Sequence, residues 1–271
     1  GVIYHGNIIL PGVTEFINWL NEENKEYLFL TNNSSRGTDA YIAKMARLGI
    51  EAFPDDFLTS ADAAIRYLRG RYLPDTVYYV CGTESLKNQL RLAGLRVAET
   101  LRDDCAVVLL GYDTELTYEK IKTSALLLLD KKVEFLATHP DFVCPTDAGP
   151  LPDIGSFIRM YEAATGRSPQ RIFGKPCTEV LEPVLSKYER KDVCMVGDRL
   201  MTDKVLGENA GIDFILVLSG ETTEADLPKV HKQERIKALK RLFHIGPADK
   251  RLPQKTYILP DLGSLVFEDD K

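Results

Sequence analysis

Short apolar segments, most of them followed by a helical pattern, recur along the whole chain. They lie at 27–30, 77–80, 106–110, 133–137, 171–173, 193–196 and 214–218. Between them, apolar residues recur at helical spacing, as at 41–48, 60–68, 85–92, 117–129 and 156–165. Because strands that alternate with helical crossovers form parallel sheets, this order predicts an α/β fold with a doubly wound, mostly parallel sheet.

The strands and helices between residues 73 and 167 form a self-contained series. On both sides of this series, strands end in polar residues, as they do at ligand sites of open α/β sheets. We therefore predict one core built from 1–72 and 168–271, with 73–167 inserted as an α/β cap domain. A length of 271 residues suits this division, since it fits one large domain or two modest ones.

Composition excludes several classes of protein. A net charge of −6 and a sequence pI near 5.4 argue against a nucleic-acid binder, which is usually basic. No apolar run approaches the length of a membrane span and no signal peptide is visible, so we expect a cytoplasmic protein without a membrane partner. The five cysteines form no C-x-x-C pair, and Cys81, Cys105 and Cys194 lie in apolar segments, which predicts reduced, buried thiols.

Two carboxylates follow the apolar segment 193–196. Gly197 ends that segment, Asp198 and Asp203 come next, and a helical pattern starts at once. This order places the carboxylates at the sheet edge where open α/β folds bind ligands. Paired carboxylates suit a hard cation, typically Mg²⁺. The alternative is structural, with Asp198 capping the helix and Asp203 as a solvated acid of its first turn.

Polar residues also follow two other predicted strands. The cluster 31–35, Thr-Asn-Asn-Ser-Ser, offers hydroxyl, amide and backbone N–H groups that can bind phosphate, or it is an ordinary polar loop. Lys175 stands between Gly174 and Pro176 after 171–173, where its point charge can meet an anion. A lone exposed lysine more often serves solubility.

The segment 133–137 ends in Thr-His-Pro-Asp at 138–141. His139 and Asp141 can meet a substrate there, or they can form a turn with the intervening proline. The connection that follows, 139–154, carries four prolines, which makes it stiff for a long loop.

These strand ends share one geometry. Because each follows a predicted parallel strand, Thr31 and Asn32, Lys175, and the two carboxylates Asp198 and Asp203 can reach a common site at one sheet edge. A phosphate there would meet a hydroxyl, an ammonium and a cation held by carboxylates. This combination suits phosphoryl transfer.

The chain resembles the phosphatases of the haloacid dehalogenase (HAD) superfamily, of the NagD and p-nitrophenyl phosphatase type with a class IIA cap. The resemblance covers nearly the whole chain. Residues 30–35, 174–176 and 197–203 match the family's second, third and fourth motifs, and 138–141 resembles its cap signature. The opening segment 1–6 resembles the residues that directly follow the family's Asp-x-Asp motif.

The resemblance implies a Mg²⁺-dependent phosphatase that hydrolyses a small phosphorylated metabolite through an aspartyl-phosphate. It implies that Thr31 holds a phosphate oxygen with help from Asn32, and that Lys175 offsets charge between nucleophile and phosphate. Asp198 would ligate Mg²⁺, with Asp203 as a further ligand or its support. The cap, which carries His139 and Asp141 in its signature, would exclude water and choose the substrate.

One departure from the family concerns the start of the sequence. The Asp-x-Asp pair is absent, and we expect the native chain to carry it, after an apolar strand, directly before Gly1. If the pair is truly missing, the alternative is an inactive phosphate-binding or regulatory module on the same fold. The chain has neither C-x5-R nor G-x-G-x-x-G, which excludes a cysteine-dependent phosphatase and a dinucleotide-binding dehydrogenase. The sequence leaves open the substrate, a possible homodimer and the role of the basic segment 229–255.

Overall fold

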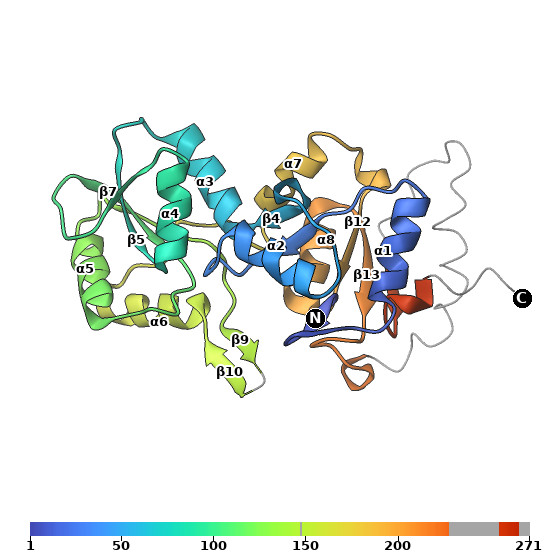
Figure 1. Cartoon of the computed structure of the whole chain (residues 1–271). Helices are drawn as coiled ribbons and strands as arrows, with labels where there is room; N and C mark the ends of the chain where they lie inside the picture. Colours follow the sequence, from blue (N-terminus) through green and yellow to red (C-terminus); the bar gives the residue numbers. More distant parts are fainter. Residues whose placement is uncertain (147, 228–254, 266–271) are drawn as a thin grey trace, which may run out of the picture. The chain divides into compact units, whose positions relative to one another are not determined.

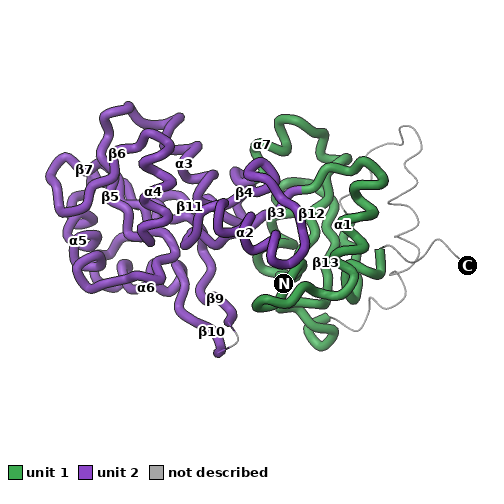
Figure 2. Tube along the Cα trace, viewed as in Figure 1, with its two compact units in different colours: residues 1–27, 181–271 green, residues 28–180 purple. Residues whose placement is uncertain are grey.

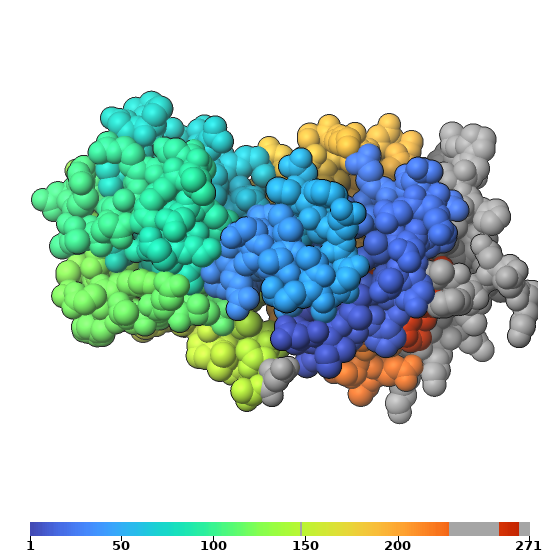
Figure 3. Space-filling model, viewed as in Figure 1, coloured from blue at the N-terminus to red at the C-terminus, as the bar shows by residue number. Residues whose placement is uncertain are grey.

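The computed structural model describes residues 1–146, 148–227 and 255–265. The chain forms two compact units, which we call unit 1 and unit 2 (Figure 2). Unit 1 consists of Gly1–Tyr27 and Leu181–Lys271, and unit 2 of Leu28–Val180. Unit 2 is therefore continuous in sequence, whereas unit 1 joins the two ends of the chain. Figure 1 labels the helices and some of the strands of both units, and Figure 3 shows the same view as a space-filling model.

Unit 2 is built around a five-stranded sheet in the order β11-β8-β7-β5-β6, in which every neighbouring pair is parallel. Its strands are β5 (Val77–Cys81), β6 (Arg96–Ala98), β7 (Cys105–Leu110), β8 (Glu134–Ala137) and β11 (Arg171–Ile172). A separate parallel pair consists of β3 (Phe29–Thr31) and β4 (Phe57–Thr59), and an antiparallel hairpin of β9 (Val143–Thr146) and β10 (Gly149–Pro152). The helices are α2 (Thr38–Arg47), α3 (Ser60–Arg71), α4 (Glu84–Leu92), α5 (Tyr118–Leu129) and α6 (Ile154–Thr165).

The sequence explains where several of these helices begin. Thr59, Thr83 and Thr117 precede α3, α4 and α5, and each side chain accepts a hydrogen bond from a backbone N–H of the first turn. Asp153 does the same for α6, which ends at Gly166 with φ 68°, a backbone conformation that favours glycine. The starts of these four helices are thus fixed by local hydrogen bonds.

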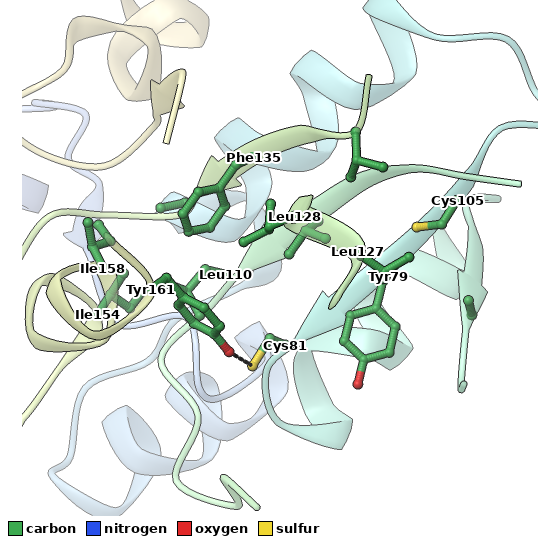
Figure 4. Packing of buried hydrophobic residues seen from close by; sticks show 14 of the residues in the cluster. Tyr79, Cys81, Cys105, Leu110, Leu127, Leu128, Phe135, Ile154, Ile158 and Tyr161 are labelled. Carbon is green, nitrogen blue, oxygen red and sulfur yellow. Dashed lines mark hydrogen bonds between the residues drawn. The ribbon is translucent and has the colours of Figure 1, made fainter. Parts of the chain in front are cut away.

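A hydrophobic cluster fills the interior of unit 2 (Figure 4). The sheet contributes residues such as Leu110 and Phe135, and α5 contributes Leu128, all three fully buried. From α6, Ile158 and Tyr161 join the same cluster, and the Tyr161 hydroxyl lies 3.4 Å from the Cys81 sulfur. Burial raises the pKa of the Tyr161 phenol, which therefore stays protonated. Helix α6 is anchored firmly to the sheet by these contacts.

Unit 1 contains a parallel sheet in the order β12-β13-β14, formed by β12 (Cys194–Gly197), β13 (Asp213–Val217) and β14 (Thr256–Leu259). It also contains a short hairpin of β1 (Tyr4–His5) and β2 (Ile8–Ile9), and the helices α1 (Val13–Glu22), α7 (Glu182–Leu185) and α8 (Val205–Ala210). A π-helical turn, Leu200–Lys204, leads into α8. At the start of α1, Gly12 has φ 76°, and a Cβ there would lie 2.1 Å from the backbone nitrogen of Gly263. Only glycine fits that close approach.

The predicted α/β fold with a mostly parallel sheet is confirmed. The segments 77–80 and 193–196 lie in different sheets, and the inserted cap with its bounds 1–72, 73–167 and 168–271 stays a prediction. Strand β11, which we placed in the core after residue 168, pairs with β8 in the five-stranded sheet. The basic segment 229–255 lies outside the described residues apart from Lys255.

Two further details concern cysteines and membranes. The cysteines Cys81, Cys105, Cys144, Cys177 and Cys194 are all free, and Cys81 and Cys105 are buried as predicted. The prediction that Cys194 is buried is wrong: this residue is exposed, because it begins β12 at the edge of the three-stranded sheet. Among the described residues, no helix combines the length and the apolar character needed to cross a membrane.

Candidate active site

The loop that follows β3 is fixed by its own side chains. The Thr31 hydroxyl accepts a hydrogen bond from the backbone N–H of Asn33 at 3.2 Å, and the Asn33 side chain accepts one from the N–H of Ser35 at 2.9 Å. The Ser34 hydroxyl lies 2.8 Å from that of Thr138, which follows β8. Because a hydroxyl that accepts one hydrogen bond still has a proton to donate, Thr31 can bind a phosphate oxygen.

Asn32 connects this loop to Lys175, which follows β11. Its Oδ1 accepts a hydrogen bond from the Lys175 N–H at 2.8 Å, and its Nδ2 donates to the Lys175 carbonyl at 3.1 Å. Because one amide side chain engages both peptide groups of the lysine, the backbone of Lys175 is fixed. Asn32 is itself buried, with 7% of its surface exposed. Its role is therefore structural support of the lysine as well as any contact with phosphate.

The Asn32 amide also meets the segment 138–141. Its Nδ2 donates to the Asp141 carboxylate, at 3.2 Å to Oδ1 and 3.3 Å to Oδ2. His139 is 1% exposed and lies between two carboxylates, with Nδ1 at 3.8 Å from Asp141 Oδ2 and Nε2 at 3.6 Å from Asp153 Oδ1. Unit 2 thus brings four predicted site residues together: Asn32, His139, Asp141 and Lys175.

In unit 1, Asp198 follows β12 and is 9% exposed. Its Oδ2 accepts hydrogen bonds from the Gly1 nitrogen and from the backbone N–H of Glu221, both at 2.8 Å. A Cβ on Gly220 would lie 2.1 Å from this oxygen, so only glycine allows the approach. Burial by itself raises the pKa of Asp198, but the hydrogen bonds that its carboxylate accepts from the Gly1 nitrogen and the Glu221 N–H lower it. The net pKa is below the ordinary value, and the carboxyl is an anion at neutral pH.

Asp203 lies in the π-helical turn and is 2% exposed, so it is not the solvated surface acid of the structural alternative. Its Oδ2 accepts hydrogen bonds from the backbone N–H groups of Asp198 and Arg199, both at 3.1 Å. A Cβ on Gly197 would lie 2.3 Å from the Cβ of Asp203. Asp203 therefore shapes the turn that presents Asp198.

The donor set of this turn fits a hard cation. Mg²⁺ in proteins is held by one or two carboxylates and completes its shell with water and substrate phosphate oxygens. Asp198 and Asp203 supply two buried carboxylates within a single turn. Among the described residues, no group of three or more His, Cys, Asp or Glu side chains is arranged to hold a metal. A site here would accordingly use these two carboxylates and substrate oxygens.

The sequence analysis missed one residue of the polar site in unit 2, Asp153. Its position before a helical pattern reveals the cap of α6, but its proximity to His139 depends on a contact that no local spacing encodes. The predicted meeting of Thr31 and Lys175 with Asp198 joins residues of the two units and stays a prediction.

Comparisons with known proteins agree with this arrangement. The family described as haloacid dehalogenase-like hydrolase matches residues 1–96, and the family described as HAD-hydrolase-like matches 172–241. The acid sugar phosphatase of Staphylococcus haemolyticus is 35% identical over 237 residues, covering 86% of this chain and 88% of that protein.

Solved structures give the same result. The 4-nitrophenylphosphatase of Thermotoga maritima superimposes with a TM-score of 0.82 at 36% identity, covering 98% of this chain and 93% of that one. The glycerol phosphate phosphatase of Mycobacterium tuberculosis in complex with magnesium gives 0.81 at 27% identity, covering 98% and 74%. With the four motif segments in place at their strand ends, the chain belongs to the haloacid dehalogenase-like hydrolase family, as a phosphatase of the NagD and 4-nitrophenylphosphatase type.

Proposed function

We propose that this chain is a Mg²⁺-dependent phosphatase that hydrolyses the monoester of a small sugar phosphate through an aspartyl-phosphate intermediate. The proposal rests above all on Asp198, a buried carboxylate that follows a parallel strand and is kept anionic by its hydrogen bonds. The acid sugar phosphatase and 4-nitrophenylphosphatase relatives support an ester of phosphate as substrate.

Thr31, Asn32 and Lys175 would bind the phosphate in this proposal. The Thr31 hydroxyl donates to a phosphate oxygen, and the Lys175 ammonium neutralises charge as an anionic nucleophile approaches the phosphate dianion. Asn32 holds the Lys175 backbone by two hydrogen bonds, so little reorganisation is needed when charge develops. A preorganised loop stabilises the transition state without the free-energy cost of ordering its groups during the reaction.

The attacking carboxylate would come from an Asp-x-Asp segment joined to Gly1. The nitrogen of Gly1 lies 2.8 Å from Asp198 Oδ2, so a residue joined to it would lie beside the carboxylates. Its first Asp would attack phosphorus and release the sugar oxygen, which takes a proton from the second Asp. Water, deprotonated by that second Asp, would then attack the aspartyl-phosphate and free inorganic phosphate.

Asp198 would ligate the cation, with Asp203 as a further ligand or as the support of the turn. When bound, Mg²⁺ supplies positive charge that offsets the repulsion between the anionic nucleophile and the phosphate. Cytoplasmic location, a homodimer and the cap as the substrate-selecting element stay predictions from the sequence.

A substitution at Lys175 tests the role of its charge. Lys175→Met should lower kcat for 4-nitrophenyl phosphate by about 100- to 1000-fold, because the ammonium serves the transition state. The melting temperature should change little. Lys122→Met removes an exposed lysine of the same unit, paired with Glu119 at 2.7 Å, and should keep full activity.

Two results would decide against the proposal. Unchanged turnover with lower thermal stability in Lys175→Met would make this lysine structural. A native full-length protein that binds phosphate but hydrolyses no member of a panel of sugar phosphates, with or without Mg²⁺, would be the inactive phosphate-binding module instead.

A further inference from the structure

A chain of buried polar contacts runs through unit 2 from the start of α6 to Lys175. Its five members come from four separate places in the sequence: the cap of α6, the segment 139–141, the loop after β3 and the loop after β11. They are Asp153, His139, Asp141, Asn32 and Lys175. The helices and strands of unit 2 do not need these contacts in order to form, so the contacts can serve another role.

The first part of the chain is rigid because α6 is rigid. Ile154 and Tyr161 place this helix in the hydrophobic cluster of unit 2 (Figure 4). The first turn then holds the preceding segment: the N–H of Gly155 donates to the Asp141 carbonyl at 2.8 Å. A Cβ on Gly155 would lie 2.5 Å from the Pro140 carbonyl oxygen, so the two backbones are in closest contact. The position of Asp141 is therefore set by α6.

His139 fills the space between Asp141 and Asp153. The Asp141 N–H donates to Nδ1 of the imidazole at 3.4 Å, so a neutral ring carries its proton on Nε2. That nitrogen faces Asp153 Oδ1 at 3.6 Å. With 1% of its surface exposed, His139 has little surface with which to touch a substrate.

Asp141 in turn fixes the orientation of the Asn32 side chain. The carboxylate accepts from Asn32 Nδ2 on both oxygens, which fixes which end of the amide is the donor. Oδ1 of Asn32 consequently points to the Lys175 N–H. Gly174 leaves the necessary space, since a Cβ there would lie 2.6 Å from Asn32 Oδ1 and 2.7 Å from the His139 Cβ.

We propose that Asp141 and His139 are positioning residues, which act through Asn32 on Lys175 and tie the phosphate-binding loop to the start of α6. The inference rests on the proposed function, because Lys175 must meet the phosphate. It differs from the expectation that these two side chains contact the substrate. A positioning role affects the phosphate whatever it is attached to, whereas a substrate contact depends on the leaving group.

The test compares Asp141→Ala and Asp141→Asn in the full-length protein. We expect Asp141→Ala to lower kcat/KM about 10- to 100-fold, by the same factor for 4-nitrophenyl phosphate and glucose 6-phosphate. Asp141→Asn keeps an acceptor for Asn32 and should recover much of the loss. His139→Ala should fall between them. Glu134→Gln is the control and should stay active. Glu134 lies on β8, where its carboxylate accepts a hydrogen bond from the Tyr72 hydroxyl, and the chain of contacts through Asn32 does not include it.

A double-mutant cycle isolates the path through Asn32. In an Asn32→Ala background, Asp141→Ala should cost no further activity, because the two substitutions break the same link. Losses that multiply would overturn the inference, as would a loss for glucose 6-phosphate much larger than that for 4-nitrophenyl phosphate.

Binding of inorganic phosphate, measured by calorimetry, separates this inference from the proposed function. Weaker phosphate binding in Asp141→Ala, with recovery in Asp141→Asn, supports the positioning role even if turnover is never seen. Wild-type turnover that Asp141→Ala leaves unchanged overturns the positioning role alone. Neither turnover nor phosphate binding in the wild type overturns both.

Discussion

Asp198 and Asp203 are both buried carboxylates of one turn, but their hydrogen bonds differ. Asp198 accepts from distant parts of unit 1, at Gly1 and Glu221, whereas Asp203 accepts from the backbone of the turn itself. Asp198 is thus held by parts of the unit outside the turn, whereas Asp203 stabilises the backbone of the turn itself. Substitutions at the two positions should therefore fail in different ways.

Asp198→Asn should lower Mg²⁺ affinity and kcat by more than about 100-fold. Removing the charge of a direct metal ligand costs more than removing a residue that only holds the ligand in place. The amide keeps the shape of the side chain, so the protein should stay folded. Titration calorimetry with Mg²⁺ and hydrolysis at several Mg²⁺ concentrations measure both quantities. Full activity in this variant would remove Asp198 from the metal site.

Asp203→Asn should lower activity less, by about 10- to 100-fold, and should also lower the free energy of unfolding. An amide offers one acceptor oxygen without charge to two backbone N–H groups that now share a carboxylate oxygen. Urea unfolding and Mg²⁺-dependent hydrolysis, measured on the same variant, test whether the loss of stability and the loss of activity occur together. A stable protein with a large loss of metal affinity would instead make Asp203 a direct ligand.

For single residues, the position just after a predicted strand was the feature of the sequence that best predicted the site. Asn32, Lys175 and Asp198 each follow a strand of the structure, and that placement was readable from the apolar segment before each one. Contacts between side chains far apart in sequence were not readable. The Asn32 amide joins Lys175 and Asp141 by hydrogen bonds that depend on the packing of three loops, and no local pattern records that packing.

Among the elements, α4 links the core of unit 2 to the loop after β3. Thr83 caps this helix by accepting from the Leu86 N–H at 3.2 Å, and it donates to the Ser35 carbonyl at 2.9 Å. The residue is 1% exposed. One hydroxyl therefore satisfies a helix end and a loop carbonyl together.

Thr83→Val keeps the shape of the side chain but removes both hydrogen bonds, and should lower the free energy of unfolding by about 1–2 kcal/mol. Thr83→Ser keeps the hydroxyl and should lose much less. Urea denaturation followed by circular dichroism measures the difference. Equal losses in both variants would mean that the methyl group, not the hydroxyl, stabilises this helix start.

The elements that the sequence predicted were those with a continuous apolar segment or helical periodicity. The hairpin of β9 and β10 was missed because Pro145, Pro150 and Pro152 read as a stiff loop, although proline is tolerated in a two-stranded edge. The short strands β4 and β6 were missed as well. Three residues are too few to show a period of two, and only their pairing partners define them.

For the whole molecule, two units with separate sheets should unfold as separable cooperative blocks. Leu128→Ala removes a fully buried side chain of the unit 2 cluster and should cost about 2–5 kcal/mol there. The single tryptophan, Trp19, lies in α1 of unit 1 and reports on that unit alone. We expect circular dichroism to show an earlier transition in urea while the Trp19 fluorescence transition stays in place.

Leu129→Ala is the matched control, because the neighbouring leucine of the same helix is 64% exposed. This variant should behave as the wild type in both measurements. If Leu128→Ala shifts the Trp19 transition as far as the circular dichroism transition, the units unfold together and the expectation of separate blocks is wrong.

The way in which the chain is divided also bears on its synthesis. Unit 2 is continuous from Leu28 to Val180, whereas unit 1 needs both Gly1–Tyr27 and the strands that begin at Cys194. Since the N-terminal side of a protein leaves the ribosome first, at about 5–20 residues per second, unit 2 can fold while its C-terminal neighbour is still being translated. Helix α1, whose Val13 and Ile17 are buried in the folded unit, must wait for that C-terminal segment. The nascent chain therefore passes through a stage in which residues 1–27 wait for the C-terminal segment of their own unit, and a chaperone would be of most use in that interval.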